Sequence, residues 1–288
     1  MKIGTLLRQA AVLLQQAGCD APRLDAELLL MKIWHLSRTD LIVRVNDMVP
    51  ETIEKDFNRL LQRRIHREPL AYIIGQKEFW SRPFLVTPDV LIPRPETEHL
   101  IEAVLERFPD QQAALRFCDI GTGSGCIAVT LACEYPRATV VATDISAAAL
   151  AVARLNAKQL GVIDRMMFRQ GDMLAALCPE DYPFDAVISN PPYVAEHEMG
   201  ALEQELAQEP RHALTDERDG LKYLTMILRD GPEHLQPGGY IMVETGLCGL
   251  PATPDPLIHD QSIYDLAGHL RGGVYYLASA SGCKSSEK

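Results

Sequence analysis

Short apolar runs of strand length alternate with longer amphipathic segments through the middle and later part of the chain. The runs that predict strands span residues 116–120, 139–143, 166–170, 186–189 and 240–244. The segments that predict helices lie near residues 124–134, 147–160 and 217–235. This alternation is typical of an α/β fold, a parallel sheet with helices on both faces. Ligands of such sheets bind at the carboxyl ends of the strands, so the residues there are the candidates for a site.

The chain ahead of this alternation predicts a small helical N-terminal domain over residues 1–70. Apolar residues recur at helical spacing in residues 3–17, 24–33 and 51–66. Gly18 follows the first run as a stop, and Pro22 and Pro50 stand at the starts of the other two.

Residues 71–95 no longer show helical spacing of apolar residues, and they predict a β-hairpin linker. Short strands are expected at residues 72–74, 79–80 and 84–86, with Gly75 and Pro83 as breaks. A helix is expected from about Glu96 to Phe108. We expect the sheet domain to span residues 96–278 and the small, polar residues 279–288 to form a frayed tail.

The net charge is unevenly distributed along the 288 residues. The whole chain carries −11, but residues 1–80 hold 12 Lys and Arg against 10 Asp and Glu, which leaves −13 on the remainder. An acidic chain is unlike a protein that binds nucleic acid over its whole surface. The asymmetry favours two functional regions, of which the first is the more basic.

The cysteines and the apolar runs indicate a cytoplasmic protein. The seven cysteines form no Cys-x-x-Cys pair, so neither a zinc cluster nor a redox motif is indicated. Scattered thiols in odd number fit a reducing compartment. No apolar run approaches the roughly 20 residues of a membrane span, and the first residues lack the features of a signal peptide.

The first strand of the alternation ends in a glycine-rich turn, Asp119-Ile-Gly121-Thr122-Gly123-Ser124-Gly125. Glycines there let the backbone turn tightly and approach a ligand closely. A dinucleotide fingerprint needs a glycine where Cys126 stands, which disfavours a nicotinamide dehydrogenase. The spacing resembles the first motif of class I S-adenosylmethionine methyltransferases, and the alternative is a turn of no special role.

Two more strand ends carry acids. Asp144 ends the second strand, 23 residues after Gly121, where a carboxylate can accept hydrogen bonds from ribose hydroxyls. As an alternative, Asp144 or Ser146 caps the helix that follows. After the third strand, the methyltransferase resemblance implies that Asp172 faces the adenine amino group and that Met173 lies beside the ring. Asp172 is otherwise a surface acid.

The fourth strand is followed directly by Asn190-Pro191-Pro192-Tyr193. The two prolines lack N–H donors and keep their carbonyl acceptors. The Asn190 amide adds an acceptor and Tyr193 adds a flat ring. Neutral acceptors beside an aromatic face suit a planar –NH2 group, so this segment is the strongest candidate for a catalytic and substrate-binding site.

The same motif resembles that of methyltransferases acting on adenine N6, cytosine N4 or the glutamine side-chain amide. Hydrogen bonds to the Asn190 side-chain oxygen and the Pro191 carbonyl would aim the nitrogen lone pair at the methyl group of the cofactor. They would also stabilise the positive charge that grows on nitrogen. Tyr193 would hold the flat group by stacking.

Residues 1–247 together resemble the release-factor glutamine methyltransferases. The likeness includes the helical domain, Gly75 with Glu78-Phe79-Trp80, and the segment Leu91-Ile-Pro-Arg94-Pro-Glu96-Thr-Glu98. The resemblance implies methylation of the glutamine in the Gly-Gly-Gln loop of peptide chain release factors, with S-adenosylmethionine as cofactor. It also implies that the cofactor lies at Gly121–Gly125, Asp144, Met173 and Asn190, and the substrate glutamine at Asn190–Tyr193.

Two charged groups stay ambiguous at this point. Arg94, Glu96 and Glu98 have two interpretations. They are either charges at the start of a helix, where acids are favourable in the first turn, or part of the active-site mouth. The run Arg59, Arg63, Arg64, His66 and Arg67 is either a solvated helix face or a docking patch for an acidic release factor. We expect a monomer that has no stable nucleic-acid partner, no membrane and no metal.

The C-terminal region departs from the family pattern. After residue 246 the family has a helix and then two strands, but prolines 251, 254 and 256 are incompatible with a helix interior. We expect that helix to be shortened or lost, which would expose part of one sheet face, and residues 274–277 to form a final strand. The alternatives that stay open are a ribosomal-protein glutamine methyltransferase, a nucleic-acid aminomethyltransferase and a non-catalytic binding module.

Overall fold

The computed structural model describes residues 1–278, and its contacts divide the chain into two compact units. The first unit comprises Met1–Gln76 together with Glu203–Gln208, and the second comprises Lys77–Leu202 and the chain from Glu209 onward. The expected tail, residues 279–288, lies outside the described residues. None of the helices in the described part is long and apolar enough to cross a membrane.

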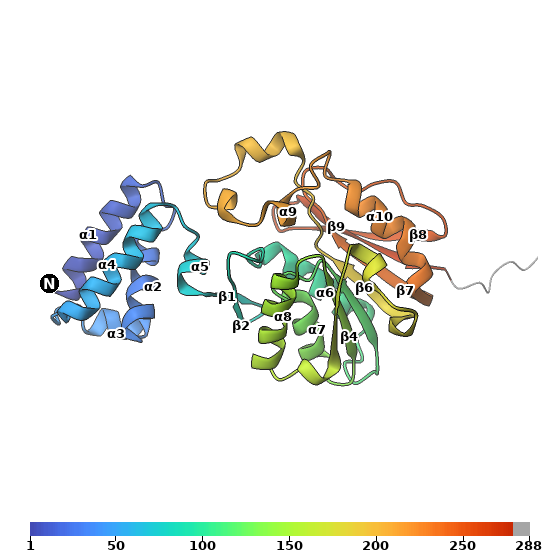
Figure 1. Ribbon diagram of the computed structural model, residues 1–288, viewed down its shortest axis with the longest axis horizontal. Helices are drawn as coiled ribbons and strands as arrows, with labels where there is room; N and C mark the ends of the chain where they lie inside the picture. Colours follow the sequence, from blue (N-terminus) through green and yellow to red (C-terminus); the bar gives the residue numbers. More distant parts are fainter. Residues whose placement is uncertain (279–288) are drawn as a thin grey trace, which may run out of the picture. The chain divides into compact units, whose positions relative to one another are not determined.

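The first unit is a bundle of short helices, as the apolar periodicity predicts (Figure 1). Its helices are α1 (Ile3–Gln16), α2 (Pro22–Trp34), α3 (Arg38–Val43), α4 (Glu51–Ile65) and α5 (Leu70–Ile74). Apolar side chains from these helices form one core, with Leu7, Leu29 and Phe57 fully buried. The helix α3 is too short for periodicity to predict, and it begins in a capping box between Ser37 and Asp40.

The expected strand at residues 72–74 is wrong, because these residues form the second half of α5. Pro69 precedes this helix, and Gly75 ends it with a left-handed φ of 78°. Tyr72 and Ile73 are buried. A run of three apolar residues fits a strand or a helix equally well, so only the flanking residues distinguish the two.

Arg64 is buried, which excludes the interpretation of the whole arginine run as a solvated helix face. Its Nε donates to Asp25 Oδ2 over 2.7 Å, and its Nη1 donates to Glu205 Oε1 over 2.8 Å. Arg67 pairs with the same Glu205. These two arginines hold residues 203–208 in the first unit, although the chain on either side belongs to the second. Arg59 remains exposed.

A hairpin of β1 (Gln76–Phe79) and β2 (Arg82–Leu85) follows the first unit, and all of it except Gln76 belongs to the second. Trp80 and Ser81 both adopt positive φ, at 50° and 56°, which suits a tight hairpin turn but is uncommon for residues that carry a Cβ. Glu98 accepts a hydrogen bond from the Trp80 N–H over 2.7 Å. The first turn of α6 (Glu98–Arg107) therefore anchors the hairpin turn.

A seven-stranded sheet with the order β5-β4-β3-β6-β7-β9-β8 forms the body of this unit. The five parallel strands are those predicted, with β6 and β7 starting earlier than expected: β3 (Arg116–Ile120), β4 (Thr139–Asp144), β5 (Met166–Gln170), β6 (Phe184–Ser189) and β7 (Leu235–Glu244). The pair β8 (Leu257–Tyr264) and β9 (Leu270–Leu277) closes the sheet, and β9 runs antiparallel to β7. This α/β sheet has the Rossmann-like fold that the alternation and the resemblance to class I methyltransferases lead us to expect.

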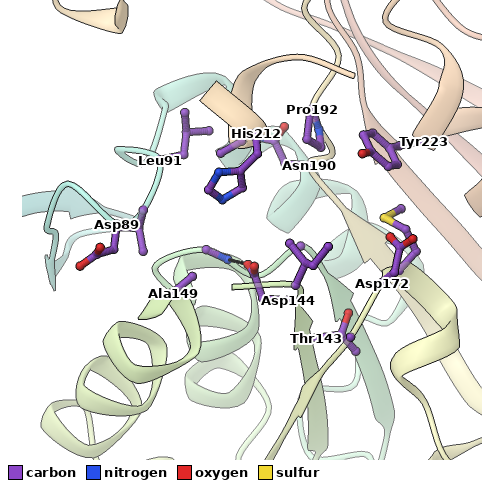
Figure 2. A pocket seen from close by; sticks show the side chains of 17 residues that line it. Asp89, Leu91, Thr143, Asp144, Ala149, Asp172, Asn190, Pro192, His212 and Tyr223 are labelled. Atoms are coloured by element: carbon purple, nitrogen blue, oxygen red, sulfur yellow. Dashed lines mark hydrogen bonds between the residues drawn. The ribbon is translucent and has the colours of Figure 1, made fainter. Parts of the chain in front are cut away.

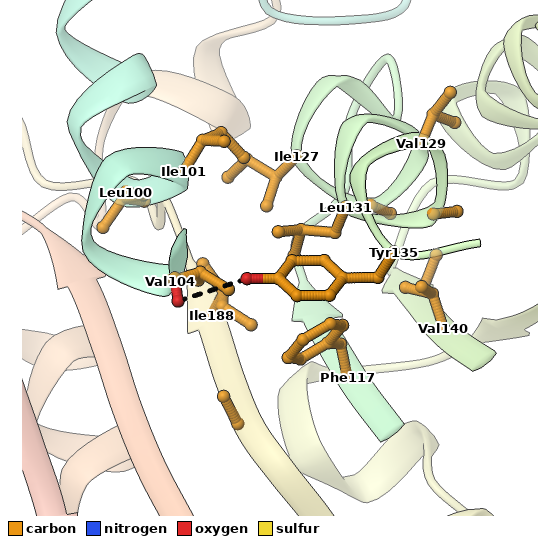
Figure 3. Close-up of a cluster of buried hydrophobic side chains, with 14 of the residues drawn as sticks. Leu100, Ile101, Val104, Phe117, Ile127, Val129, Leu131, Tyr135, Val140 and Ile188 are labelled. Atoms are coloured by element: carbon orange, nitrogen blue, oxygen red, sulfur yellow. Dashed lines mark hydrogen bonds between the residues drawn. The ribbon is translucent and has the colours of Figure 1, made fainter. Parts of the chain in front are cut away.

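Helices cover both faces of the sheet. The helices α6, α7 (Cys126–Glu134) and α8 (Ala147–Gln159) pack on one face, and α10 (Lys222–Asp230) packs on the other. Adjacent residues of one strand serve opposite faces, as Phe117 and Cys118 do. Figure 3 shows the first of these cores around Tyr135, whose hydroxyl donates to the backbone oxygens of Val104 and Phe108.

The helix expected over residues 217–235 is shorter than predicted. The helix α10 starts after Gly220, which has a φ of 83°, and it ends before the turn that contains Pro232. The remaining helical segments are short: η1 (Pro95–Thr97), η2 (Ile163–Arg165), η3 (Met173–Ala176), η4 (Pro179–Asp181), η5 (Glu196–Ala201), η6 (Leu206–Gln208), α9 (Arg211–Leu214) and η7 (Gly231–His234).

The helix that is expected to be shortened or lost after residue 246 is absent, and the final strand β9 is longer than the expected residues 274–277. Residues 245–256 contain no helix, and the two closing strands are both present. Cys248 and Leu250 from this irregular segment pack against the core under α10. Residues 245–256 thus supply apolar contacts to this face of the sheet, so the exposure expected there is reduced.

The ion pair between Asp25 and Arg64 gives a stability prediction. The substitution Asp25→Ala leaves a buried guanidinium short of one charged partner and should cost about 3 kcal/mol of unfolding free energy. Urea unfolding followed by circular dichroism measures this loss.

The matched control is Asp56→Ala, which removes an exposed carboxylate 3.6 Å from Arg59. Exposed pairs contribute under about 1 kcal/mol, so this variant should unfold close to the wild type. Equal losses in the two variants would contradict the role of the buried pair.

Candidate active site

A cleft of roughly 800 Å³, its open mouth included, lies at the carboxyl ends of β3, β4, β5 and β6. Residues that follow each of these strands line it, and Figure 2 shows Asp144, Asp172, Asn190 and Pro192 around it. The expected strand-end residues therefore meet in one place. Its volume suits a ligand the size of a nucleoside cofactor.

The glycine turn after β3 has the backbone that its sequence predicts. Gly121, Gly123 and Gly125 have φ values of 71°, 54° and 81°, which residues with a Cβ rarely adopt. Gly121 and Gly123 line the cleft. At Gly125 a Cβ would come within 3.1 Å of the Ala153 Cβ, so this glycine serves the packing of α7 against α8.

Thr122 and Ser124 do not line the cleft. The Thr122 hydroxyl donates to Asp119 Oδ2 over 2.6 Å, and the same oxygen accepts the Ala128 N–H over 3.2 Å. The Ser124 carbonyl accepts from the Asn156 amide. These contacts hold the turn in shape, and burial raises the pKa of Asp119 to about 7.

Asp144 joins the glycine turn to the end of β4. Its Oδ2 accepts the Gly123 N–H over 2.9 Å and its Oδ1 accepts the Ser146 N–H over 2.8 Å. Ser146 itself caps α8 by accepting the Ala149 N–H. Capping is therefore done by Ser146, and each Asp144 oxygen keeps a lone pair for a hydroxyl of a ligand. Burial raises the pKa of Asp144.

Asp172 and Met173 line the same cleft after β5. Met173 adopts a left-handed φ of 50°, and a Cβ at Gly171 would come within 2.9 Å of the Ala176 Cβ. This tight turn fixes the direction in which Asp172 and Met173 leave the strand. Tyr223 of α10 lies on the same side of the cleft (Figure 2).

Leu91 lines the cleft, as expected if the segment Leu91–Glu98 shapes the active-site mouth, whereas sequence reasoning did not find Tyr223, Asp89 or His212, which also line it. They come from α10, from the segment after β2 and from α9, none of which is a strand end. The imidazole of His212 points into the space between Asn190 and Asp144 (Figure 2). No motif in the sequence marks these positions.

Arg94 pairs with Glu209 over 2.5 Å, and Glu209 also accepts the Ile92 N–H over 3.0 Å. Glu209 is nearly fully buried. The pair ties the segment that carries Leu91 to the start of the segment that carries His212. Arg94 thus shapes one wall of the cleft, while Glu98 holds the hairpin turn.

The Asn190 side chain is oriented by its own hydrogen bond. Its Nδ2 donates to the Thr97 hydroxyl over 2.9 Å, which leaves Oδ1 as an acceptor. Asn190 and Pro192 line the cleft, whereas Pro191 is buried and Tyr193 is turned away, with its hydroxyl donating to Glu244 Oε1 over 2.8 Å. Contact of Pro191 or Tyr193 with a substrate stays a prediction.

The charge of the cleft tests the expected cofactor. Three carboxylates, Asp89, Asp144 and Asp172, line it, and its described lining contains no lysine or arginine. These negative charges repel the pyrophosphate of a dinucleotide and attract a cationic nucleoside. The residues present therefore fit S-adenosylmethionine, whose sulfonium is positive.

Two family models match the chain in its two regions. The model described as the PrmC N-terminal domain matches residues 5–75, and the methyltransferase small domain matches residues 97–221. Curated relatives match most of the length.

Three of these relatives are named release factor glutamine methyltransferase. That of Neisseria gonorrhoeae is 43% identical over 78% of this chain and 81% of its own. That of Nitratidesulfovibrio vulgaris is 44% identical over 84% and 81%, and that of Koribacter versatilis is 40% identical over 90% and 91%.

The position of Asp144 gives a binding prediction. Asp144→Asn should weaken binding of S-adenosylhomocysteine by about 10- to 100-fold, because hydrogen bonds to a charged acceptor are lost. Isothermal titration calorimetry measures the change. Asp164→Asn removes the same charge from an exposed residue outside the cleft and should bind as the wild type does. A change below 3-fold in Asp144→Asn would contradict the assignment.

Proposed function

The chain belongs to the release factor glutamine methyltransferase family, and we propose that it methylates the glutamine in the Gly-Gly-Gln loop of a peptide chain release factor. The methyl group goes to N5, the side-chain amide nitrogen. The observation that carries this proposal is the orientation of the Asn190 side-chain amide. Its Nδ2 donates a hydrogen bond to the Thr97 hydroxyl, and its Oδ1 is left as an acceptor. When bound, S-adenosylmethionine supplies a methyl group on an electrophilic sulfonium.

An amide nitrogen is a weak nucleophile because its lone pair is delocalised into the carbonyl. Asn190 Oδ1 and the Pro191 carbonyl oxygen would each accept one N–H of the substrate and so direct the lone pair toward the cleft. Fixed orientation of this kind can supply up to about 7–11 kcal/mol of the barrier. The same two acceptors would stabilise the positive charge that grows on nitrogen.

The pair of acceptors, Asn190 Oδ1 and the Pro191 carbonyl oxygen, favours an –NH2 group, because that group offers two N–H donors. A hydroxyl offers only one donor and so satisfies only one of the two acceptors. Both acceptors are neutral, so they need no proton transfer to work. The proton that the product nitrogen must lose can leave to water. The acidic wall of the cleft tolerates a cationic cofactor at close range.

The activity test uses cofactor with a tritiated methyl group and three acceptors: a release factor, the same factor with Gln→Ala in its Gly-Gly-Gln loop, and duplex DNA. The proposal expects label on the first acceptor alone. Label on DNA, or label that survives the Gln→Ala change, would contradict it.

Asn190→Ala gives a second test of the same site. It should lower kcat by about 100- to 1000-fold, because a preorganised acceptor is lost, while cofactor affinity stays within about 3-fold. Single-turnover methylation and calorimetry measure the two quantities. Near-normal turnover in Asn190→Ala would exclude the proposed role of its oxygen.

A further inference from the structure

His212 is the one side chain of the cleft lining, among the described residues, that can carry a positive charge. The other titratable groups of that lining are the carboxylates of Asp89, Asp144 and Asp172 and the phenol of Tyr223. The mechanism above gives His212 no task. Histidine ordinarily gains its charge between about pH 8 and about pH 5, so a cation can arise in this acidic cleft close to neutral pH.

The short helix α9, which carries His212, is tied to the rest of the second unit at both ends. Just ahead of the helix, the buried Glu209 is held by its ion pair and by a backbone N–H. At the other end, the Leu214 carbonyl oxygen accepts the Val194 N–H over 2.9 Å, and the Leu214 side chain is buried. The helix therefore has a fixed place beside the cleft.

Within the part of the chain that the structure describes, the His212 imidazole has no hydrogen bond or ion pair. The side chain is exposed. Arg211, its neighbour on α9, pairs with Glu217 over 3.1 Å and does not line the cleft. The ring nitrogens of His212 can therefore bind and release a proton without breaking a contact of the fold.

The ring points into the space between Asn190 and Asp144 (Figure 2). In the proposed function, Asp144 accepts from the ribose of S-adenosylmethionine, and Asn190 accepts from the amide that receives the methyl group. The sulfur joins that ribose to that methyl group, so it belongs in the space that His212 faces. This step rests on the proposed function.

We propose that His212 makes the discrimination between S-adenosylmethionine and S-adenosylhomocysteine depend on its protonation state. The two molecules share their adenine, ribose and amino-acid groups, and they differ in the methyl group and in the positive charge on sulfur. An imidazolium repels the sulfonium, whereas it has no such effect on the neutral thioether. The preference for the methyl donor over its demethylated product therefore weakens as His212 gains a proton.

The three carboxylates of the cleft titrate as well. Burial raises the pKa of Asp144, so the loss of its charge as the pH falls also weakens the attraction for a sulfonium. This contribution has the same sign as that of His212. Only a variant that lacks the imidazole and keeps Asp89, Asp144 and Asp172 separates the two effects.

The first test measures discrimination as the ratio of two dissociation constants, that of S-adenosylmethionine over that of S-adenosylhomocysteine, by calorimetry. Between about pH 8 and about pH 5.5 we expect this ratio to rise about 10-fold more in the wild type than in His212→Gln. His212→Lys keeps a charge throughout this range and should show the raised ratio already at about pH 8. His197→Gln makes the same change at an exposed residue of η5 outside the cleft lining and should match the wild type.

The second test counts the protons that binding releases. If S-adenosylmethionine prefers the neutral ring, its binding near pH 6.5 must release a larger fraction of a proton in the wild type than in His212→Gln, roughly in proportion to the charged fraction. S-adenosylhomocysteine should show no such difference between the two proteins. Calorimetry in buffers of different ionisation enthalpy measures the protons released.

The same pH dependence of the ratio in the wild type and in His212→Gln would overturn the proposal. An unchanged ratio in His212→Lys at high pH would also overturn it. Neither test uses a release factor, so their outcome is separate from that of the methylation assay. A wild type that discriminates as expected and yet labels no release factor would overturn the proposed function and leave the role of His212 in place.

Discussion

The Asn190 side chain donates an N–H to the Thr97 hydroxyl over 2.9 Å, and this contact decides what the end of β6 can recognise. With the amide held this way, Oδ1 is an acceptor at the edge of the cleft, and the proline carbonyls beside it are acceptors as well. A group with two N–H donors fits such an edge. Strand pairing brings Ser189 of β6 beside Val243 of β7, and the buried Glu244 that ends β7 accepts the Tyr193 hydroxyl.

The rest of the cleft follows from the sheet. Parallel strands place the ends of β3, β4, β5 and β6 at one edge, and each end contributes one part of the site. Asp144 couples two of these parts, because it holds the glycine turn and the start of α8 at once. The proposed cofactor site and the proposed substrate site therefore lie at one edge of the sheet.

The apolar runs predicted the parallel strands well, because a buried strand must be apolar over its whole length and turn residues bound it. Where a segment was short, the same signal failed, as in Tyr72 and Ile73 of α5. The sequence did not predict the burial of Arg64, for another reason. Its burial depends on Asp25 and Glu205, which lie 39 and 141 residues away, and no local pattern reports such a partnership.

The site was predicted in the same uneven way. Gly121, Gly123, Asp144, Asp172, Met173 and Asn190 lie on strand ends and line the cleft as expected. Tyr223 and His212 reach it from helices that only the folded topology brings near. Their positions depend on tertiary packing.

The central claim is that Asn190 presents an acceptor to a glutamine amide. Mass spectrometry of release-factor peptides, after incubation with the full chain and cofactor, tests this most directly by locating the added methyl group. We predict a methyl group on the side-chain nitrogen of the glutamine in the Gly-Gly-Gln loop, and its loss in Asn190→Ala. A methyl group on any other residue, or one that persists in Asn190→Ala, would contradict the claim.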